Sequence, residues 1–181
     1  MSYDKIGKSY CFSRQMRDTV SSETAQTSFT LTLLGRFTLT HHSQPLQLSR
    51  KTRALLAWLT LAEQPTTRQQ LIDLFCEAAN DPARTLRWHL SALRRTLSPT
   101  VLHTEGQAVA LNRSLFAADC WQFDTAAPST DLLTLYRGEF LEGLSLPDAP
   151  AFELWLLGVR SHYRGRLQEI AHIVIDRLIN Q

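Results

Sequence analysis

The hydrophobic pattern of the chain changes its period after the first fifty residues, and this change limits the folds open to it. Between Phe29 and Thr40 apolar and polar residues alternate, with a break at Gly35. Alternation is typical of strands with one buried face, so this stretch predicts an antiparallel strand pair with a bend or bulge at Gly35. A short third strand is predicted around residues 45–48.

Three helices are predicted between residues 49 and 97, where leucines recur at steps of three and four. Each has a recognisable start: Ser49 as N-cap of the first helix, Thr67 and Gln70 as a capping box for the second, and Asp81 followed by Pro82 for the third. Pro65 is expected to end the first helix. Residues 101–111 then predict a hairpin turning at residues 104–107, where Gly106 supplies the backbone freedom.

A sheet, three helices and a hairpin, in that order, predict an α+β fold of the winged helix-turn-helix type over residues 29–124. In that architecture the third helix, at residues 81–97, is the recognition element. Residues 1–28 are rich in Ser and Thr without a sustained period and predict a flexible tail. A small-residue and proline linker at 124–130 then leads to an all-helical unit, residues 125–181. Within it, residues 131–144 and 150–179 read as helical.

The third helix has a narrow apolar stripe and a basic opposite face. Leu86, Leu90, Leu93 and Leu97 share one side when successive residues are set about 100° apart. The residues directed away from it are Arg84, Arg87, Trp88, Ser91, Arg94 and Arg95. Guanidinium groups match phosphate oxygens and the guanine edge, and a helix fits the major groove. This face therefore predicts binding to double-stranded DNA.

The charge of the whole chain, +2, is too small to identify a polyanionic partner, but its distribution is uneven. Residues 50–97 hold eight Lys or Arg and four Asp or Glu, a net of +4. Residues 128–181 hold five Lys or Arg and seven Asp or Glu, a net of −2. The positive charge thus gathers in the part of the chain predicted to meet DNA.

Other functional classes receive little support from the sequence. The six histidines show no metal-ligand spacing, and phosphate-cradling or nucleophile motifs are missing, so neither an enzyme, a metal site nor a cofactor is expected. Cys11, Cys76 and Cys120 stand far apart, which fits a reducing cytoplasm. No apolar run is long enough for a secretory signal or a membrane span.

Four quoted stretches carry a resemblance to a known family: "LTLLGRFTL", "SRKTRALLAWL", "ARTLRWHLSALRRTL" and "VALNRSLFAADCWQFD", with "LYRGEFLEGL" further on. Together they resemble the Streptomyces antibiotic regulatory protein type of bacterial transcriptional activator, in which an OmpR-like winged helix precedes a tetratricopeptide-like activator domain. The resemblance covers about residues 29–180. The family's helical domain is longer, so this chain resembles either a fragment of such a protein or a pared-down member of the family.

The resemblance implies DNA contacts from the third helix and from the basic start of the first, namely Arg50, Lys51 and Arg53. It also implies self-association on paired half-sites and contact with RNA polymerase. Glu105 at the wing tip would repel phosphate, so Gln107 or His103 would make any wing contact.

Two questions stay open at this point. Trp155, Leu156 and Tyr163 either lie exposed where further repeats would stack, or pack on the winged helix. The alternative function is a winged-helix module that binds protein through the same helix face and the long C-terminal helix, without binding DNA.

Overall fold

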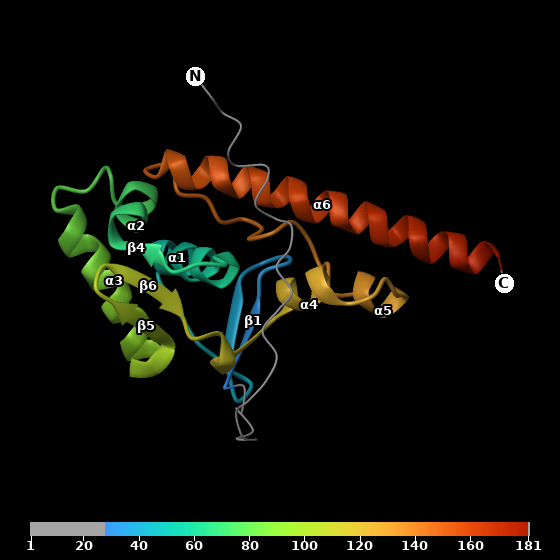
Figure 1. The fold of residues 1–181 in the computed structure, drawn as a ribbon, viewed down its shortest axis with the longest axis horizontal. Coiled ribbons are helices and arrows are strands. Elements are labelled where there is room, and N and C mark those ends of the chain that lie inside the picture. Colours follow the sequence, from blue (N-terminus) through green and yellow to red (C-terminus); the bar gives the residue numbers. More distant parts are fainter. Residues whose placement is uncertain (1–27, 181) are drawn as a thin grey trace.

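The computed structural model describes residues 28–180, and the tail predicted for residues 1–28 lies outside this range except for Ser28. The α+β class is confirmed: two small sheets and several helices share one contiguous core (Figure 1). None of the helices in the described range combines the length and the apolar character that crossing a membrane requires.

The first sheet is built on the predicted strand pair. β1 (Phe29–Thr32) and β2 (Thr38–His41) are antiparallel, and Gly35 between them has a φ of +121°, which favours glycine. β3 (Gln44–Pro45) is shorter and begins one residue earlier than predicted. A fourth strand, β7 (Phe116–Ala118), was not predicted and pairs with β1 in parallel, giving the order β3-β2-β1-β7.

The three helices begin at the predicted caps. They are α1 (Arg50–Leu61), α2 (Arg68–Phe75) and α3 (Pro82–Thr96). The side chains of Ser49 and Asp81 accept hydrogen bonds from backbone N–H groups of α1 and α3, and Thr67 and Gln70 form the capping box of α2. α1 ends at Leu61, four residues before Pro65, which the prediction had taken as its end.

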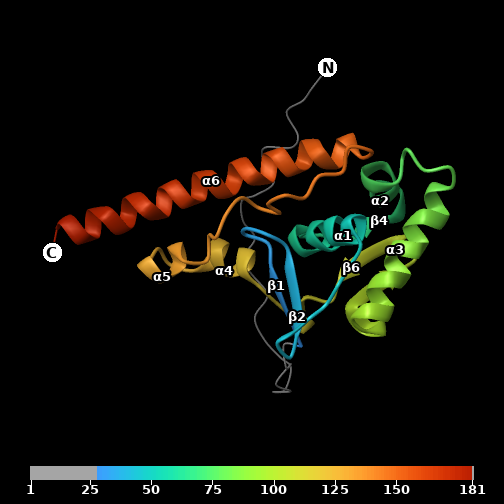
Figure 2. The same ribbon diagram turned by 180° about the vertical axis from the view of Figure 1, so that it is seen from behind.

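The predicted hairpin is present as β5 (Leu102–Glu105) and β6 (Ala108–Leu111), with Gly106 at a φ of +55° in the turn. β4 (Thr66–Thr67), which was not predicted, adds to β6 and completes a second sheet in the order β4-β6-β5. Short 3-10 turns at Pro99–Val101 and Arg113–Leu115 flank the hairpin. The hairpin lies beside α3 (Figure 1 and Figure 2).

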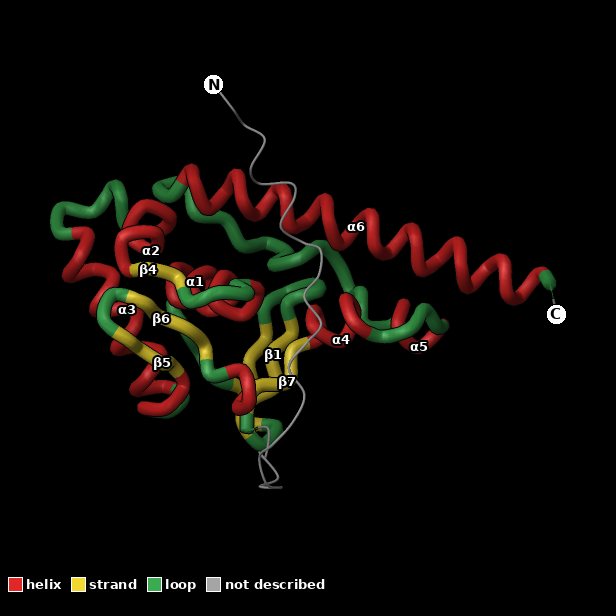
Figure 3. Tube along the Cα trace, viewed as in Figure 1, coloured by secondary structure: helices red, strands yellow, loops and turns green. Residues whose placement is uncertain are grey.

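The C-terminal part holds α4 (Asp119–Thr125), α5 (Thr130–Leu133) and the long α6 (Pro150–Ile179). The prediction of helix over residues 131–144 is wrong beyond α5. Residues 134–149 form a loop that lies alongside α6 (Figure 3).

The physical reason for this loop is a set of tertiary hydrogen bonds. The N–H groups of Arg137 and Leu141 donate to the carbonyl oxygens of Leu34 and Leu33, and Phe140 forms a bridge with Leu34. These bonds to the bend after β1 replace the bonds that a helix would have made within itself.

α6 packs on the rest of the molecule through aromatic side chains. The Phe152 ring lies 5.2 Å from that of Phe75 in α2, and the Trp155 ring lies 4.8 Å from that of Trp58 in α1. Leu156 and Tyr163 are fully buried and Trp155 is partly buried. Of the two readings left open for these residues, packing on the N-terminal part is therefore confirmed.

Candidate nucleic-acid interface

α3 is held in the core by the leucine stripe that its sequence predicted. Leu86, Leu90 and Leu93 are buried, and Leu97 just beyond the helix is partly buried. They face α1 and α2, which both contact α3. The helix is thereby fixed on one side, and its opposite side is left exposed.

The outer face of α3 carries the predicted basic residues. Arg84, Arg87, Ser91 and Arg95 are exposed, and Trp88 keeps 53% of its surface accessible. Arg94 is partly covered because its guanidinium donates to the Thr104 Oγ1 in β5, 3.1 Å away. Arg94 thus also joins α3 to the hairpin.

None of the four arginines of α3 forms an ion pair with a carboxylate within residues 28–180. The arginines of α6 differ: Arg160 and Arg164 lie beside Glu139, and Arg166 pairs with Glu169. Four unneutralised guanidinium groups on one helix favour an external anion.

A groove of about 500 Å³ forms where α2, α3 and the hairpin meet. Its floor is apolar, and its polar lining comes from Arg68, Arg87, Ser91, Arg94 and Gln107. Four of these five residues were predicted from the sequence, from two segments, and the fold brings them together.

Arg68 was missed by the sequence analysis. It is the first residue of α2, and its N–H donates to the Gln107 carbonyl oxygen at 2.8 Å, which joins the start of α2 to the hairpin turn. The capping box at Thr67 was the available signal, because it places the next residue at an exposed helix start.

The three basic residues taken from the start of α1 do not join this groove. Lys51 forms an ion pair with Asp148 at 2.6 Å, and its side chain is only 19% exposed. Arg53 donates to the Leu48 carbonyl oxygen at 2.8 Å and to Gln47, and its guanidinium lies over the Phe37 ring. Arg50 is exposed at the first position of α1.

His89 supports the basic face of α3 from within. It is buried on the core side of α3, and its Nδ1 lies 2.8 Å from the Thr52 Oγ1, which in turn lies 2.7 Å from the Ser49 Oγ. Its ring meets the Trp88 ring edge-on with centroids 4.9 Å apart. Burial, with a smaller effect of the Lys51 charge, lowers the pKa of His89 below its usual value.

We expect His89 to make folding pH-dependent. Because its pKa is lower in the folded state, its contribution to stability is present above about pH 6.5 and is lost as pH falls toward the folded pKa, with a slope of at most about 1.4 kcal/mol per pH unit. Urea unfolding at about pH 7.5 and about pH 5.5 measures the loss. His89→Asn, which does not titrate, should show a smaller pH dependence. If the stability of the His89→Asn variant depended on pH as strongly as that of the wild type, other titrating groups would be the cause.

The two cysteines of the described range are buried and unpaired. Burial is the main cause that raises the pKa of both thiols, Cys76 and Cys120. Burial therefore disfavours, at both positions, the thiolate form that reactive cysteines need.

Comparison with known proteins shows a likeness in fold. No family model matches the chain, and no curated protein matches it. Over most of its length the chain is similar in fold to part of EmbR. The solved structure of Mycobacterium tuberculosis EmbR, in complex with a low affinity phosphopeptide, superimposes with a TM-score of 0.62 at 19% identity. The match covers 77% of this chain and 43% of EmbR, so this chain corresponds to less than half of that protein.

Proposed function

We propose that the protein is a sequence-specific, DNA-binding transcriptional regulator. α2 and α3 would form a helix-turn-helix, α3 would enter the major groove, and the β5–β6 hairpin would act as the wing. The observation that carries the proposal is the basic face of α3, whose four arginines have no carboxylate partners among residues 28–180. Two of them, Arg87 and Arg94, line the groove together with Arg68 and Gln107.

The likeness in fold to EmbR supports this proposal, because EmbR is a transcriptional regulator of the family that the sequence resembles. The helical unit would then belong to a tetratricopeptide-like domain. Contact with RNA polymerase, self-association on DNA and a place in the cytoplasm remain predictions that follow from the same family resemblance.

Fluorescence anisotropy with labelled duplexes, at several salt concentrations, tests the proposal. Duplexes selected from a random pool should bind more tightly than the pool itself. If Arg68, Arg84, Arg87 and Arg95 each neutralise one phosphate, the logarithm of affinity should fall against the logarithm of salt with a slope of about −3.6. A folded protein that binds no duplex at low salt would contradict the proposal. That result would favour the protein-binding module, for which the exposed Trp88 would be the first anchor to test.

Two basic residues exchange their expected roles: Lys51, expected to contact DNA, is neutralised by Asp148, whereas Arg68, which the sequence analysis missed, lines the groove. Arg68→Ala should weaken DNA binding by about tenfold and reduce the salt slope by about 0.9, since its side chain lines the groove. Lys51→Ala should change affinity by less than about twofold, because Lys51 is neutralised by Asp148. Titration of one selected duplex with both variants measures the difference, and equal losses would show that the basic start of α1 also contacts DNA.

A further inference from the structure

Trp88 is the one large hydrophobic side chain that is exposed within residues 28–149. It keeps 53% of its surface accessible on the outer face of α3 and takes no part in the core of the described residues. At about 100° per residue, it points within about 15° of the direction opposite the buried stripe of Leu86, Leu90 and Leu93. An exposed indole contributes little to the packing of the chain itself, and it is a side chain that binding surfaces commonly use.

The residues around Trp88 on this face are basic. Arg84 lies about one turn before it and Arg95 about two turns after it. Both are exposed and have no carboxylate partner within residues 28–180. A protein that covered Trp88 would have to supply a carboxylate for each guanidinium group, or leave a charge buried. A nucleic acid supplies negative charge along its whole length, so these surroundings favour nucleic acid as the partner of Trp88.

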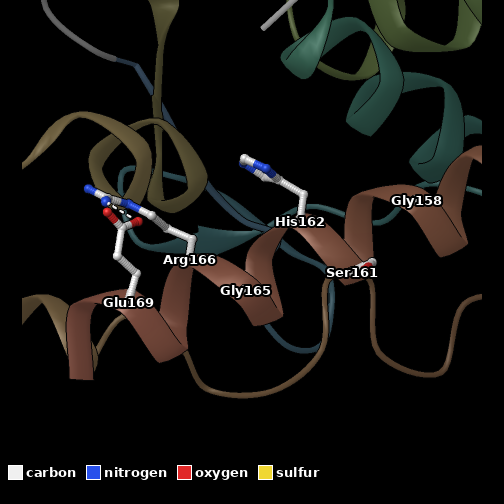
Figure 4. A pocket seen from close by; sticks show the side chains of 6 residues that line it. All are labelled: Gly158, Ser161, His162, Gly165, Arg166 and Glu169. Carbon is white, nitrogen blue, oxygen red and sulfur yellow. Dashed lines mark hydrogen bonds and ion pairs between the residues drawn. The ribbon is translucent and has the colours of Figure 1, made fainter. Parts of the chain in front are cut away.

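The other exposed large hydrophobic side chains of the described residues have different surroundings. They all lie on α6, and they are Leu154, Leu157, Ile175, Leu178 and Ile179. Figure 4 shows a shallow notch in this helix, bordered by Arg166 and Glu169, which neutralise each other at 2.8 Å. The charges of this notch therefore identify no partner, whereas those around Trp88 do.

The ring of Trp88 is supported from behind. It meets the ring of His89 edge-on, with centroids 4.9 Å apart. His89 is buried, and its Nδ1 lies 2.8 Å from the Thr52 Oγ1, so α1 fixes this imidazole. Contact with a fixed ring restricts the indole before any ligand binds, which reduces the entropy lost on binding.

The edges of base pairs in the major groove offer one apolar group, the C5-methyl group of thymine, and the O4 acceptor lies beside it. An indole matches both groups, because its ring supplies apolar surface and its N–H is a donor. The indole N–H groups of Trp58 and Trp121 donate to threonine oxygens. Within residues 28–180 the N–H of Trp88 has no acceptor, so it is available to a base.

We propose that Trp88 recognises thymine through its C5-methyl group and thereby helps to set the sequence preference of the protein. The inference rests on the proposed DNA binding and adds a contact that the arginines do not supply. Guanidinium groups match phosphate oxygens and the O6 and N7 of guanine, and neither contact selects thymine. Trp88 lies in the first half of α3, which begins at Pro82, and this is the half of a recognition helix that reaches base edges.

Replacing thymine by uracil tests the contact, because it removes the C5-methyl group and keeps O4 and the base pairing. The probe is a duplex selected by the wild type from a random pool, with each thymine replaced in turn. In fluorescence anisotropy, uracil should weaken binding by about fourfold at one thymine at least, the effect of about one buried CH₂ group. For Trp88→Ala, the thymine and uracil duplexes should differ by less than about 1.5-fold at the same position.

Two further variants show whether Trp88 acts on thymine itself. Arg95→Ala removes a neighbouring side chain from the same face, so it should bind every duplex more weakly and keep the preference for thymine over uracil. Trp88→Phe retains an aromatic ring and should keep part of the preference. Because Trp88 carries no charge, Trp88→Ala should leave the salt slope unchanged, whereas damage to the fold of α3 would reduce it.

A second selection gives an independent measurement. When Trp88→Ala is used to select duplexes from the same random pool, the uracil-sensitive thymine should no longer be enriched. The other positions of the selected sequence should stay enriched, because the arginines of α3 are still present.

Four results would overturn the inference and leave the proposed DNA binding intact. They are a selected sequence without thymine, a wild type that tolerates uracil at every position, a Trp88→Ala variant that still distinguishes the two bases, and unchanged enrichment in the second selection. A folded wild type that binds no duplex at low salt would instead overturn both proposals, and would leave Trp88 as an anchor for a protein partner.

Discussion

Replacing both Arg87 and Arg95 by alanine is expected to weaken binding to a selected duplex by about a hundredfold or more. Both side chains lie on the exposed face of α3 and have no carboxylate partner within residues 28–180. Each contact to a base or phosphate contributes about 1–3 kcal/mol, and about 1.4 kcal/mol corresponds to tenfold in affinity. The salt slope should also fall by about 1.8, because two phosphate contacts are lost.

The control for this experiment removes the same charge from another place. Arg164→Ala with Arg177→Ala takes two positive charges from α6, away from α3 (Figure 1). If long-range charge alone governed binding, the Arg164→Ala, Arg177→Ala variant would lose as much affinity for DNA as the Arg87→Ala, Arg95→Ala variant. If the loss depends on contact, affinity should change by less than about threefold. Equal effects of the two double variants would contradict the assignment of α3 as the recognition helix. Circular dichroism of both variants should match the wild type, because all four side chains lie on the surface.

Phe152→Ala should lower the free energy of unfolding by about 3–5 kcal/mol, as is typical for a buried phenylalanine. Phe152 is fully buried, and its ring packs against Phe75 at 5.2 Å and Trp155 at 5.4 Å. Since Phe75 belongs to α2 and Phe152 to α6, the cavity would open where α6 meets α2. We expect one cooperative urea transition with a lower midpoint, because the buried residues of both parts form one core.

Leu178→Ala gives the matched comparison for this measurement. It removes an apolar side chain from the same helix at a position that is 63% exposed, and should change stability by less than about 0.5 kcal/mol. A Phe152→Ala protein with two separate transitions, the earlier one confined to α6, would show that the helical unit folds independently. A loss similar to that of Leu178→Ala would show that the contact with α2 contributes little.

Local sequence signals were sufficient wherever an element is defined by its own residues. Ser49, Thr67 and Asp81 each cap the helix they were predicted to start, because a cap acts on N–H groups only two or three residues away. The spacing of the leucines in α3 correctly predicted which side of this helix is buried, because helical periodicity is also a local property. The basic face of α3 was therefore predictable, down to Arg84 and Arg87.

Contacts between residues that are distant in the sequence could not be predicted from such local signals. β7 forms because β1 offers it a parallel partner, and residues 134–149 leave the helix because Leu33 and Leu34 accept their hydrogen bonds. The same holds for the candidate interface: Arg68 and Gln107 reach the groove only when α2 and the hairpin are packed beside α3.

The helix starts, the alternating strands, the hairpin turn and the basic face of α3 could be predicted from neighbouring residues, since each depends on contacts within a few positions. Which cations are neutralised and which remain unpaired depends instead on how the chain folds. Lys51 and Arg87 look equally basic in the sequence, yet Asp148, ninety-seven positions after Lys51, neutralises one of them and no described carboxylate neutralises the other. Neutralisation depends on charges being close in space, and chain folding alone brings such distant residues together.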